Sequence, residues 1–219
     1  LSLEGNAGRI DILHNISIKV ETGTSVGLIG PSGSGKSSLL MLLGGLERAT
    51  SGSVMAMGKN LSEMNEDALA RLRRENMGVV FQSFHLIPTM TALENVATPL
   101  ELAGRKDAFE RAAAELEAVG LGHRLDHYPN QMSGGEQQRV ALARAAAPQP
   151  NIVLADEPTG NLDGANGSAI MDLLFGLQER HGSTLILVTH AEELADKCDR
   201  IIRLQDGHIV EDATKVAAQ

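Results

Sequence analysis

The first part of the chain alternates hydrophobic and polar positions. Residues 10–20 place isoleucine or valine at positions 10, 12, 16, 18 and 20, which predicts a strand with one covered face. Short apolar runs of the kind that form buried strands lie at residues 25–29, 78–81, 152–155 and 184–189. Residues 52–57 are expected to add a short strand. Near the end of the chain, Asp206-Gly207 separates two apolar runs and predicts a hairpin.

Helical periodicity fills the intervals between these strands. Helices are expected at residues 38–43, 66–74, 107–119, 136–147, 165–181 and 191–198. Another helix should begin after Thr91, because Thr91 and Glu94 have the spacing of a capping box. One stripe of the helix at 107–119 should be buried, and it consists of Phe109, Ala113, Leu116 and Val119. Because strand–helix alternation flanks a helix-rich stretch, the pattern predicts an α/β core split by a helical insertion.

The size and charge of the chain narrow its class. With 219 residues there is room for one core with a subdomain, and 42% hydrophobic and 21% charged residues are ordinary for a globular protein. The net charge of −9 argues against nucleic acid as a partner, because phosphate backbones are bound by clustered lysine and arginine. Cys198 is the only cysteine, which excludes an internal disulfide. No run approaches the ~18 consecutive apolar residues of a membrane span, so any membrane part is expected from another chain.

A glycine-rich string follows the apolar run at 25–29 and precedes an expected helix. The phosphate-loop pattern G-x-x-x-x-G-K-[ST] is filled by Gly30, Pro31, Ser32, Gly33, Ser34, Gly35, Lys36 and Ser37, and Ser38 follows. The glycines let successive N–H groups face one anion, and the helix start adds its dipole. Lys36 would reach the β- and γ-phosphates, and the Ser37 hydroxyl would bind Mg²⁺. The alternative is a plain linker loop, but the strand–loop–helix context favours a nucleotide phosphate site.

Two further expected strands end in residues that suit phosphate chemistry. The run at 152–155 leads into Asp156-Glu157, where Asp156 would serve Mg²⁺ and Glu157 would orient or deprotonate the attacking water. The run at 184–189 leads into His190, which would face the γ-phosphate and contact Glu157. The simpler alternatives are that the acids cap a turn and that Thr189 to Glu192 forms a plain capping box. Because ligands bind beyond the carboxyl ends of parallel strands, we expect these residues to converge on the phosphate loop.

A second candidate anion site lies in the helical insertion. Ser133, Gly134, Gly135 and Glu136 have the pattern of a capped helix start, which exposes N–H donors and a hydroxyl without side-chain bulk. The alternative is a helix start with no other role. Two remote phosphate cradles cannot easily serve one nucleotide in one subunit. A head-to-tail homodimer, in which each cradle closes on the partner's ATP, would use both.

At this point the chain resembles the ATP-binding cassette family. The motifs occur in the family's order over nearly the whole chain, and they include the phosphate loop, Gln82, Ser133 to Gln137, Asp156-Glu157, Asn161-Leu162-Asp163 and His190. The chain looks closest to the cassettes of lipoprotein-release and macrolide-efflux systems. The resemblance implies a P-loop NTPase core of the RecA type with an N-terminal antiparallel β subdomain and an inserted α-helical subdomain. Within one domain over 1–219, residues 1–88 and 148–219 would form the core and residues 89–147 the helical signature subdomain.

The resemblance also implies roles and partners. Gln82 would reach Mg²⁺ and sense the γ-phosphate, and Asp163 would couple the two sites of an ATP-dependent dimer. A membrane permease would dock near Phe84, Leu86 and Ile87, with the cassette on the cytoplasmic face of the inner membrane; the alternative is an ATPase that regulates an envelope or cytosolic partner and transports nothing. The signature begins with Met132 in place of the usual leucine, a swap of similar volume. The aromatic residue that often stacks on adenine is absent, and Leu3 is its nearest counterpart, so ATP and GTP are expected to be turned over comparably.

Overall fold

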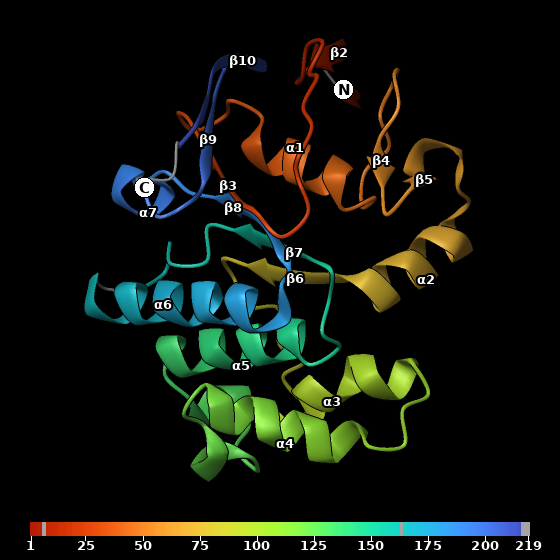
Figure 1. The fold of residues 1–219 in the computed structure, drawn as a ribbon. Coiled ribbons are helices and arrows are strands. Elements are labelled where there is room, and N and C mark those ends of the chain that lie inside the picture. Colours follow the sequence, from red (N-terminus) through yellow and green to blue (C-terminus); the bar gives the residue numbers. More distant parts are fainter. Residues whose placement is uncertain (6–7, 163, 216–219) are drawn as a thin grey trace. The chain divides into compact units, whose positions relative to one another are not determined.

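Strands and helices of the computed structural model are described for residues 1–5, 8–162 and 164–215 (Figure 1). The chain divides into two units, and each is described by itself. The first consists of Leu1–Arg73 and Leu185–Gln219, and the second of Arg74–Thr184. Both contain parallel strands and helices, which confirms the predicted α/β class.

A buried parallel strand is the centre of the first unit. Strand β3 (Ser25–Ile29) is buried along its whole length and pairs in parallel with β8 (Thr184–Val188) on one side and β9 (Arg200–Gln205) on the other. This burial on both faces is expected of an uninterrupted apolar run. Strand β10 (His208–Thr214) then pairs with β9 in antiparallel orientation. The predicted hairpin is confirmed, and Asp206 and Gly207 have φ angles of 48° and 76°.

Two short antiparallel pairs complete the sheets of this unit. Strand β1 (Ser2–Gly5) pairs with β2 (Gly8–Asp11), which confirms the antiparallel N-terminal element, and β4 (Met55–Ala56) pairs with β5 (Lys59–Asn60). The expected strand over 10–20 is wrong beyond Asp11, and the one over 52–57 shrinks to β4. Residues 15–20 do alternate between exposed and half-buried positions. The hydrophobic alternation therefore predicted correctly which side of the segment is covered. It did not show whether a neighbouring strand is present to pair with it.

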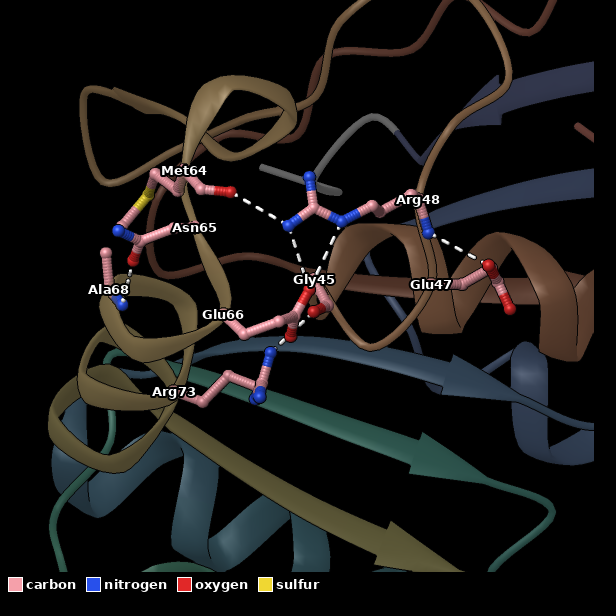
Figure 2. Close-up of polar contacts among 8 residues, drawn as sticks. All are labelled: Gly45, Glu47, Arg48, Met64, Asn65, Glu66, Ala68 and Arg73. Carbon is pink, nitrogen blue, oxygen red and sulfur yellow. Dashed lines mark hydrogen bonds and ion pairs between the residues drawn. The ribbon is translucent and has the colours of Figure 1, made fainter.

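Polar contacts fix the segment between the first two helices. Helix α1 (Lys36–Leu43) ends at Gly44 as predicted, and α2 (Glu66–Asn76) follows a short 3-10 turn, η1 (Leu61–Glu63). Figure 2 shows Arg48 donating to the Glu66 carboxylate at 2.8 Å and to the Met64 carbonyl at 3.0 Å. Arg73 of α2 donates to the carbonyl of Gly45, just past the end of α1. These contacts hold the segment that follows α1 against α2.

The second unit combines a parallel strand pair with a helical core. Strand β6 (Met77–Phe81) runs parallel to β7 (Ile152–Asp156), with Phe81 opposite Asp156. The helices are α3 (Ala92–Leu102), α4 (Ala108–Ala118), α5 (Gly134–Ala146) and α6 (Gly164–His181), with the 3-10 turns η2 (Gly122–Arg124) and η3 (Pro129–Gln131) before α5. Helices α3, α4 and α5 pack around one apolar cluster (Figure 1). In the part of the chain that the structure describes, no helix combines the length and apolar composition of a membrane span.

The predicted buried stripe of α4 needs a correction. Phe109 is 46% exposed, whereas Ala108, Ala112, Leu116 and Val119 lie in the core. Small alanine side chains let α4 approach its neighbours closely, so they and not the phenylalanine face inward. The predicted division into residues 1–88 with 148–219 and residues 89–147 stays a prediction.

Candidate nucleotide site

The phosphate loop lies in the first unit, between β3 and α1. Gly30, Gly33 and Gly35 have φ angles of 144°, 78° and 95°, which side chains rarely adopt. A Cβ at Gly30 would lie 2.0 Å from the carbonyl oxygen of Leu204, and one at Gly35 would lie 2.6 Å from Cδ2 of Leu13. Conformation therefore favours glycine at both positions, and space also requires it at Gly30, where the obstructing atom is backbone.

Lys36 is held against its own loop. The residue is 6% exposed, and its ammonium donates to the carbonyls of Gly30 and Pro31 at 2.9 and 2.8 Å. It has three donor hydrogens, so these two bonds leave capacity for an anion. Gly35 occupies the N-cap of α1 and provides no side-chain cap for the first amides of the helix. The Ser34 hydroxyl is buried and has no hydrogen-bond partner among the described residues.

His190 lies in the same unit as the phosphate loop. Leu28 of β3 is in register with Val188 of β8, so His190 and Gly30 follow these strands at the same edge of the sheet. The capping box from Thr189 to Glu192, the simpler alternative for this segment, is not formed. Helix α7 (Glu192–Ala195) begins after Ala191, and the Thr189 hydroxyl accepts a hydrogen bond from the Ala191 N–H at 3.1 Å. The Glu192 carboxylate instead forms an ion pair with Arg203 at 3.0 Å.

The second unit holds the carboxylates and Gln82. Because Phe81 and Asp156 are in register on parallel strands, Gln82 and Glu157 follow at one edge of the pair. Glu157 has a φ of 46°, which is unusual for a residue with a side chain, and its carbonyl accepts from the Gly160 N–H at 3.0 Å. Strained backbone of this kind persists where the surroundings determine it and is frequent at functional sites. The expected convergence of these residues with Lys36 and His190 stays a prediction.

Asn161 is a site residue to which the sequence assigned no role of its own. Its side-chain amide donates to the Gln82 carbonyl at 2.9 Å, and the Gln82 Nε2 donates to its Oδ1 at 3.3 Å. The glutamine also lies against Gly160, where a Cβ would be 2.6 Å from Nε2. Asn161 and Gln82 are 79 positions apart, so no local pattern could have linked them.

The capped helix start predicted at Ser133 is confirmed at the start of α5, whereas its role as an anion site stays a prediction. Ser133 is the N-cap, its hydroxyl accepts from the Glu136 N–H at 3.3 Å, and the Glu136 carboxylate accepts from the Ser133 N–H at 2.8 Å. This donation by the Ser133 N–H, aided by the Arg124 charge, holds the pKa of Glu136 below its usual range. Met132 is buried in the helical core. Asp163 and the Leu3 side chain lie outside what the structure describes, so their expected roles are not addressed by it.

The comparisons with known proteins agree with these motifs. A family model described as ABC transporter matches residues 13–160. The uncharacterized ABC transporter ATP-binding protein YbbA of Escherichia coli K12 is 53% identical over 206 residues, which cover 93% of this chain and 90% of that protein. The lipoprotein-releasing system ATP-binding protein LolD 2 of Caulobacter vibrioides is 50% identical over 205 residues, with 93% and 90% covered.

A solved structure extends the similarity to the fold. The ATP-binding cassette MJ0796, in a dimeric post-hydrolysis state bound to ADP and Pi, superposes with a TM-score of 0.90 at 40% identity. The match covers 97% of this chain and 94% of that one. The predicted RecA-type cassette fold and the resemblance to lipoprotein-release cassettes are thereby confirmed. The chain belongs to the ABC transporter family, as an ATP-binding cassette with ATPase activity.

Proposed function

We propose that this cassette dimerises head to tail on Mg-ATP and drives a separate membrane protein from the cytoplasmic face of the inner membrane. The observation that carries the proposal is the fully formed capping box at Ser133, which would serve as a second phosphate cradle in a chain that already has a phosphate loop. A relative at 40% identity was solved as a dimer bound to ADP and Pi, which supports the dimer. The name of the LolD 2 relative supports extraction of lipoproteins or similar membrane cargo as the work performed.

The phosphate loop binds the triphosphate in this proposal. Lys36 and the loop amides contact the β- and γ-phosphates, and Ser38 follows at the start of α1. His190 contacts the γ-phosphate from the neighbouring strand end. Each of these groups acts by position and charge, which is the main source of catalysis in phosphoryl transfer.

The residues assigned to Mg²⁺ have suitable donor atoms. Ser37, Gln82 and Asp156 offer a hydroxyl, an amide carbonyl and a carboxylate, and Mg²⁺ prefers such oxygen ligands. The Gln82 Nε2 is oriented toward Asn161 Oδ1, which turns the amide oxygen away from that contact. When bound, the ion would neutralise charge on the β- and γ-phosphate oxygens.

The reaction then uses residues of both subunits. Glu157 orients the attacking water and accepts its proton, while Ser133, Gly134, Gly135 and Glu136 of the partner close on the γ-phosphate. Asp163 would link the two sites. Binding closes the dimer, and hydrolysis with product release opens it, so the cycle delivers a mechanical stroke.

The permease is proposed to dock on residues 82–91, here called the docking loop. Arg144 of α5 donates to the carbonyls of Phe84 and His85 at 2.8 and 2.7 Å, and these two residues have φ angles of 58° and 47°. Asn95 is fully buried, accepts from the Ile87 N–H at 2.8 Å and donates back to the Ile87 carbonyl at 3.1 Å. A loop held in one conformation by two side chains is pre-organised, which lowers the entropic cost of binding.

The docking loop also carries the apolar side chains predicted to meet the permease. Leu86 packs against the helical core and Phe84 is half-buried, with its Cζ 3.7 Å from the Cβ position of Gly134. Ile87 is 37% exposed. Ile87 is therefore the residue of the three that is best placed for a partner, whereas the others also support the fold.

We expect Ile87→Glu to weaken capture of the membrane partner at least about tenfold, because a carboxylate would be desolvated in an apolar interface. The matched control is Val210→Glu on β10, where the side chain is 55% exposed. The amount of membrane partner captured by each variant is measured by quantitative pull-down. Melting curves show that each variant is folded. Equal capture by the two variants would place the permease contact elsewhere.

The proposal as a whole is tested by pull-down of Glu157→Gln protein with Mg-ATP from detergent-solubilised native membranes, followed by mass spectrometry. We expect one integral membrane protein in stoichiometric amount, and the same experiment with ADP as the control should lose it. If only soluble partners are captured while the ATP-bound dimer forms, the ATPase stands and the regulatory alternative replaces transport.

A further inference from the structure

The carboxylate of Glu136 forms hydrogen bonds with both Ser133 and Arg124. Its Oε2 accepts from the Ser133 hydroxyl at 2.9 Å and from the Ser133 N–H at 2.8 Å. Its Oε1 accepts from Nε of Arg124, in η2, at 3.0 Å. The Glu136 side chain is 15% exposed and that of Arg124 is 33% exposed, so the pair is largely shielded from solvent.

Arg124 is itself held from the other side. Its Nη1 lies 3.0 Å from Nε2 of His127. A guanidinium has only donors, so the histidine must accept at Nε2 and carry its hydrogen on Nδ1. Arg124 and His127 belong to one turn, closed by the His127 N–H on the Arg124 carbonyl at 3.0 Å. That turn is tied to α3, because the His127 carbonyl accepts from the Ala92 N–H at 2.8 Å.

The contact with Arg124 bears on the negative charge that Glu136 places next to a proposed phosphate-binding site at Ser133. A capping box needs only an acceptor at Glu136, and glutamine would supply it without charge. A carboxylate in hydrogen-bond contact with Ser133 repels any phosphate bound to the same hydroxyl. The guanidinium on the opposite carboxylate oxygen offsets that repulsion and fixes the orientation of the carboxylate.

We propose that Arg124 is a positioning residue of the signature site, which neutralises and orients Glu136 so that the Ser133 hydroxyl can turn its one hydrogen from that carboxylate to the γ-phosphate of the partner's nucleotide. The inference rests on the proposed head-to-tail dimer. It assigns Arg124 a role that depends on the charge at position 136, whereas an ordinary structural ion pair would contribute only to folding.

The test measures ATP-driven dimerisation by sedimentation, with Glu157→Gln as the parent so that ATP persists. Adding Arg124→Gln should raise the dimer dissociation constant at least about tenfold, because one uncompensated charge faces the phosphate. Adding Glu136→Gln to that variant should restore the constant to within about threefold, since the cap survives and the charge is gone. Nucleotide affinity of the monomer should be equal in all three proteins, because Lys36 and its loop are unchanged.

Two further measurements separate repulsion from loss of structure. The Arg124→Gln defect should shrink with added KCl, because the screening length falls from about 10 Å at 0.1 M to about 3 Å at 1 M. Arg105→Gln, which breaks a 2.8 Å ion pair with Asp107, should leave dimerisation unchanged. If Arg124→Gln does not fold, Arg124→Lys keeps the charge and should dimerise nearly as the parent does.

Each outcome has one meaning. Failure of the parent itself to dimerise overturns the proposed function and not merely the role of Arg124. A parent that dimerises, with Arg124→Gln equally tight, overturns the inference. A defect that Glu136→Gln does not repair, or an Arg124→Lys protein that is folded yet monomeric, also overturns it, because geometry and not charge would then be decisive.

Discussion

Glu157→Gln should abolish turnover while retaining ATP binding, and it should leave the protein as a stable dimer in the presence of Mg-ATP. The expected loss in kcat is about 10²- to 10⁴-fold, the range for removal of a general base. Glutamine has nearly the same size as glutamate and keeps the turn that begins at position 157. The phosphate loop lies in another part of the chain, so nucleotide affinity should be unchanged.

The reason to expect so selective an effect is the backbone at this position. Glu157 follows β7 with a φ of 46°, and its carbonyl is held by the Gly160 N–H at 3.0 Å. A non-glycine residue in this conformation costs of order 1 kcal/mol or more, and the surrounding turn fixes it. The backbone that carries the side chain is thus fixed rather than part of a loose loop, which suits a group that must meet one water.

The matched control is Glu179→Gln, the same chemical change on an exposed part of α6. Phosphate release, fluorescent-nucleotide titration and sedimentation with Mg-ATP make the measurements. The control should behave as the unmodified protein in all three. A Glu157→Gln protein with normal phosphate release would remove Glu157 from the mechanism, and one that fails to bind nucleotide would assign it a structural role instead.

The sequence predicted an element correctly where the residues that form it are near one another in the chain. The capping boxes at Thr91 and Ser133 and the hairpin at Asp206-Gly207 formed as expected, because each depends on three or four neighbouring residues. The strand expected over 10–20 failed because alternation reports a covered face, whereas a strand also needs a partner. The buried stripe of α4 was right at Leu116 and Val119 but wrong at Phe109, because alanine-rich helices allow more than one buried stripe.

The same distinction, between residues that act locally and residues with distant partners, applies to the site. The phosphate loop is a contiguous string, so its glycines, Lys36 and Ser37 were identifiable from spacing alone. Asn161, Arg124, Asn95 and Arg144 act on groups that are distant in the sequence or unmarked by any local pattern. Glu192 of α7 pairs with Arg203 of β9 instead of completing a capping box with Thr189. Contacts of this kind depend on the tertiary fold, so they cannot be predicted from the pattern of a single sequence.

Gly30→Ala should reduce nucleotide affinity at least about 100-fold, although the motif would keep its lysine and serine. Gly30 has a φ of 144°, and a Cβ there would lie 2.0 Å from the carbonyl oxygen of Leu204 and 3.0 Å from the Ser34 hydroxyl. The Leu204 carbonyl belongs to the backbone of β9, which pairs with β3 on one side and β10 on the other, so it cannot retreat. The loop must therefore move, and with it the Gly30 carbonyl that accepts from Lys36 at 2.9 Å.

Gly58→Ala is the control that separates collision with a neighbouring atom from backbone strain alone. Gly58 has a φ of 71° but nothing within 4 Å of its Cβ position, so alanine there costs about 1 kcal/mol in conformation and meets no atom. We expect Gly58→Ala to bind nucleotide normally and Gly30→Ala to bind poorly while still melting cooperatively. If Gly30→Ala binds as tightly as Gly58→Ala, the loop tolerates displacement from Leu204, and its amides must reach the phosphates from a different conformation.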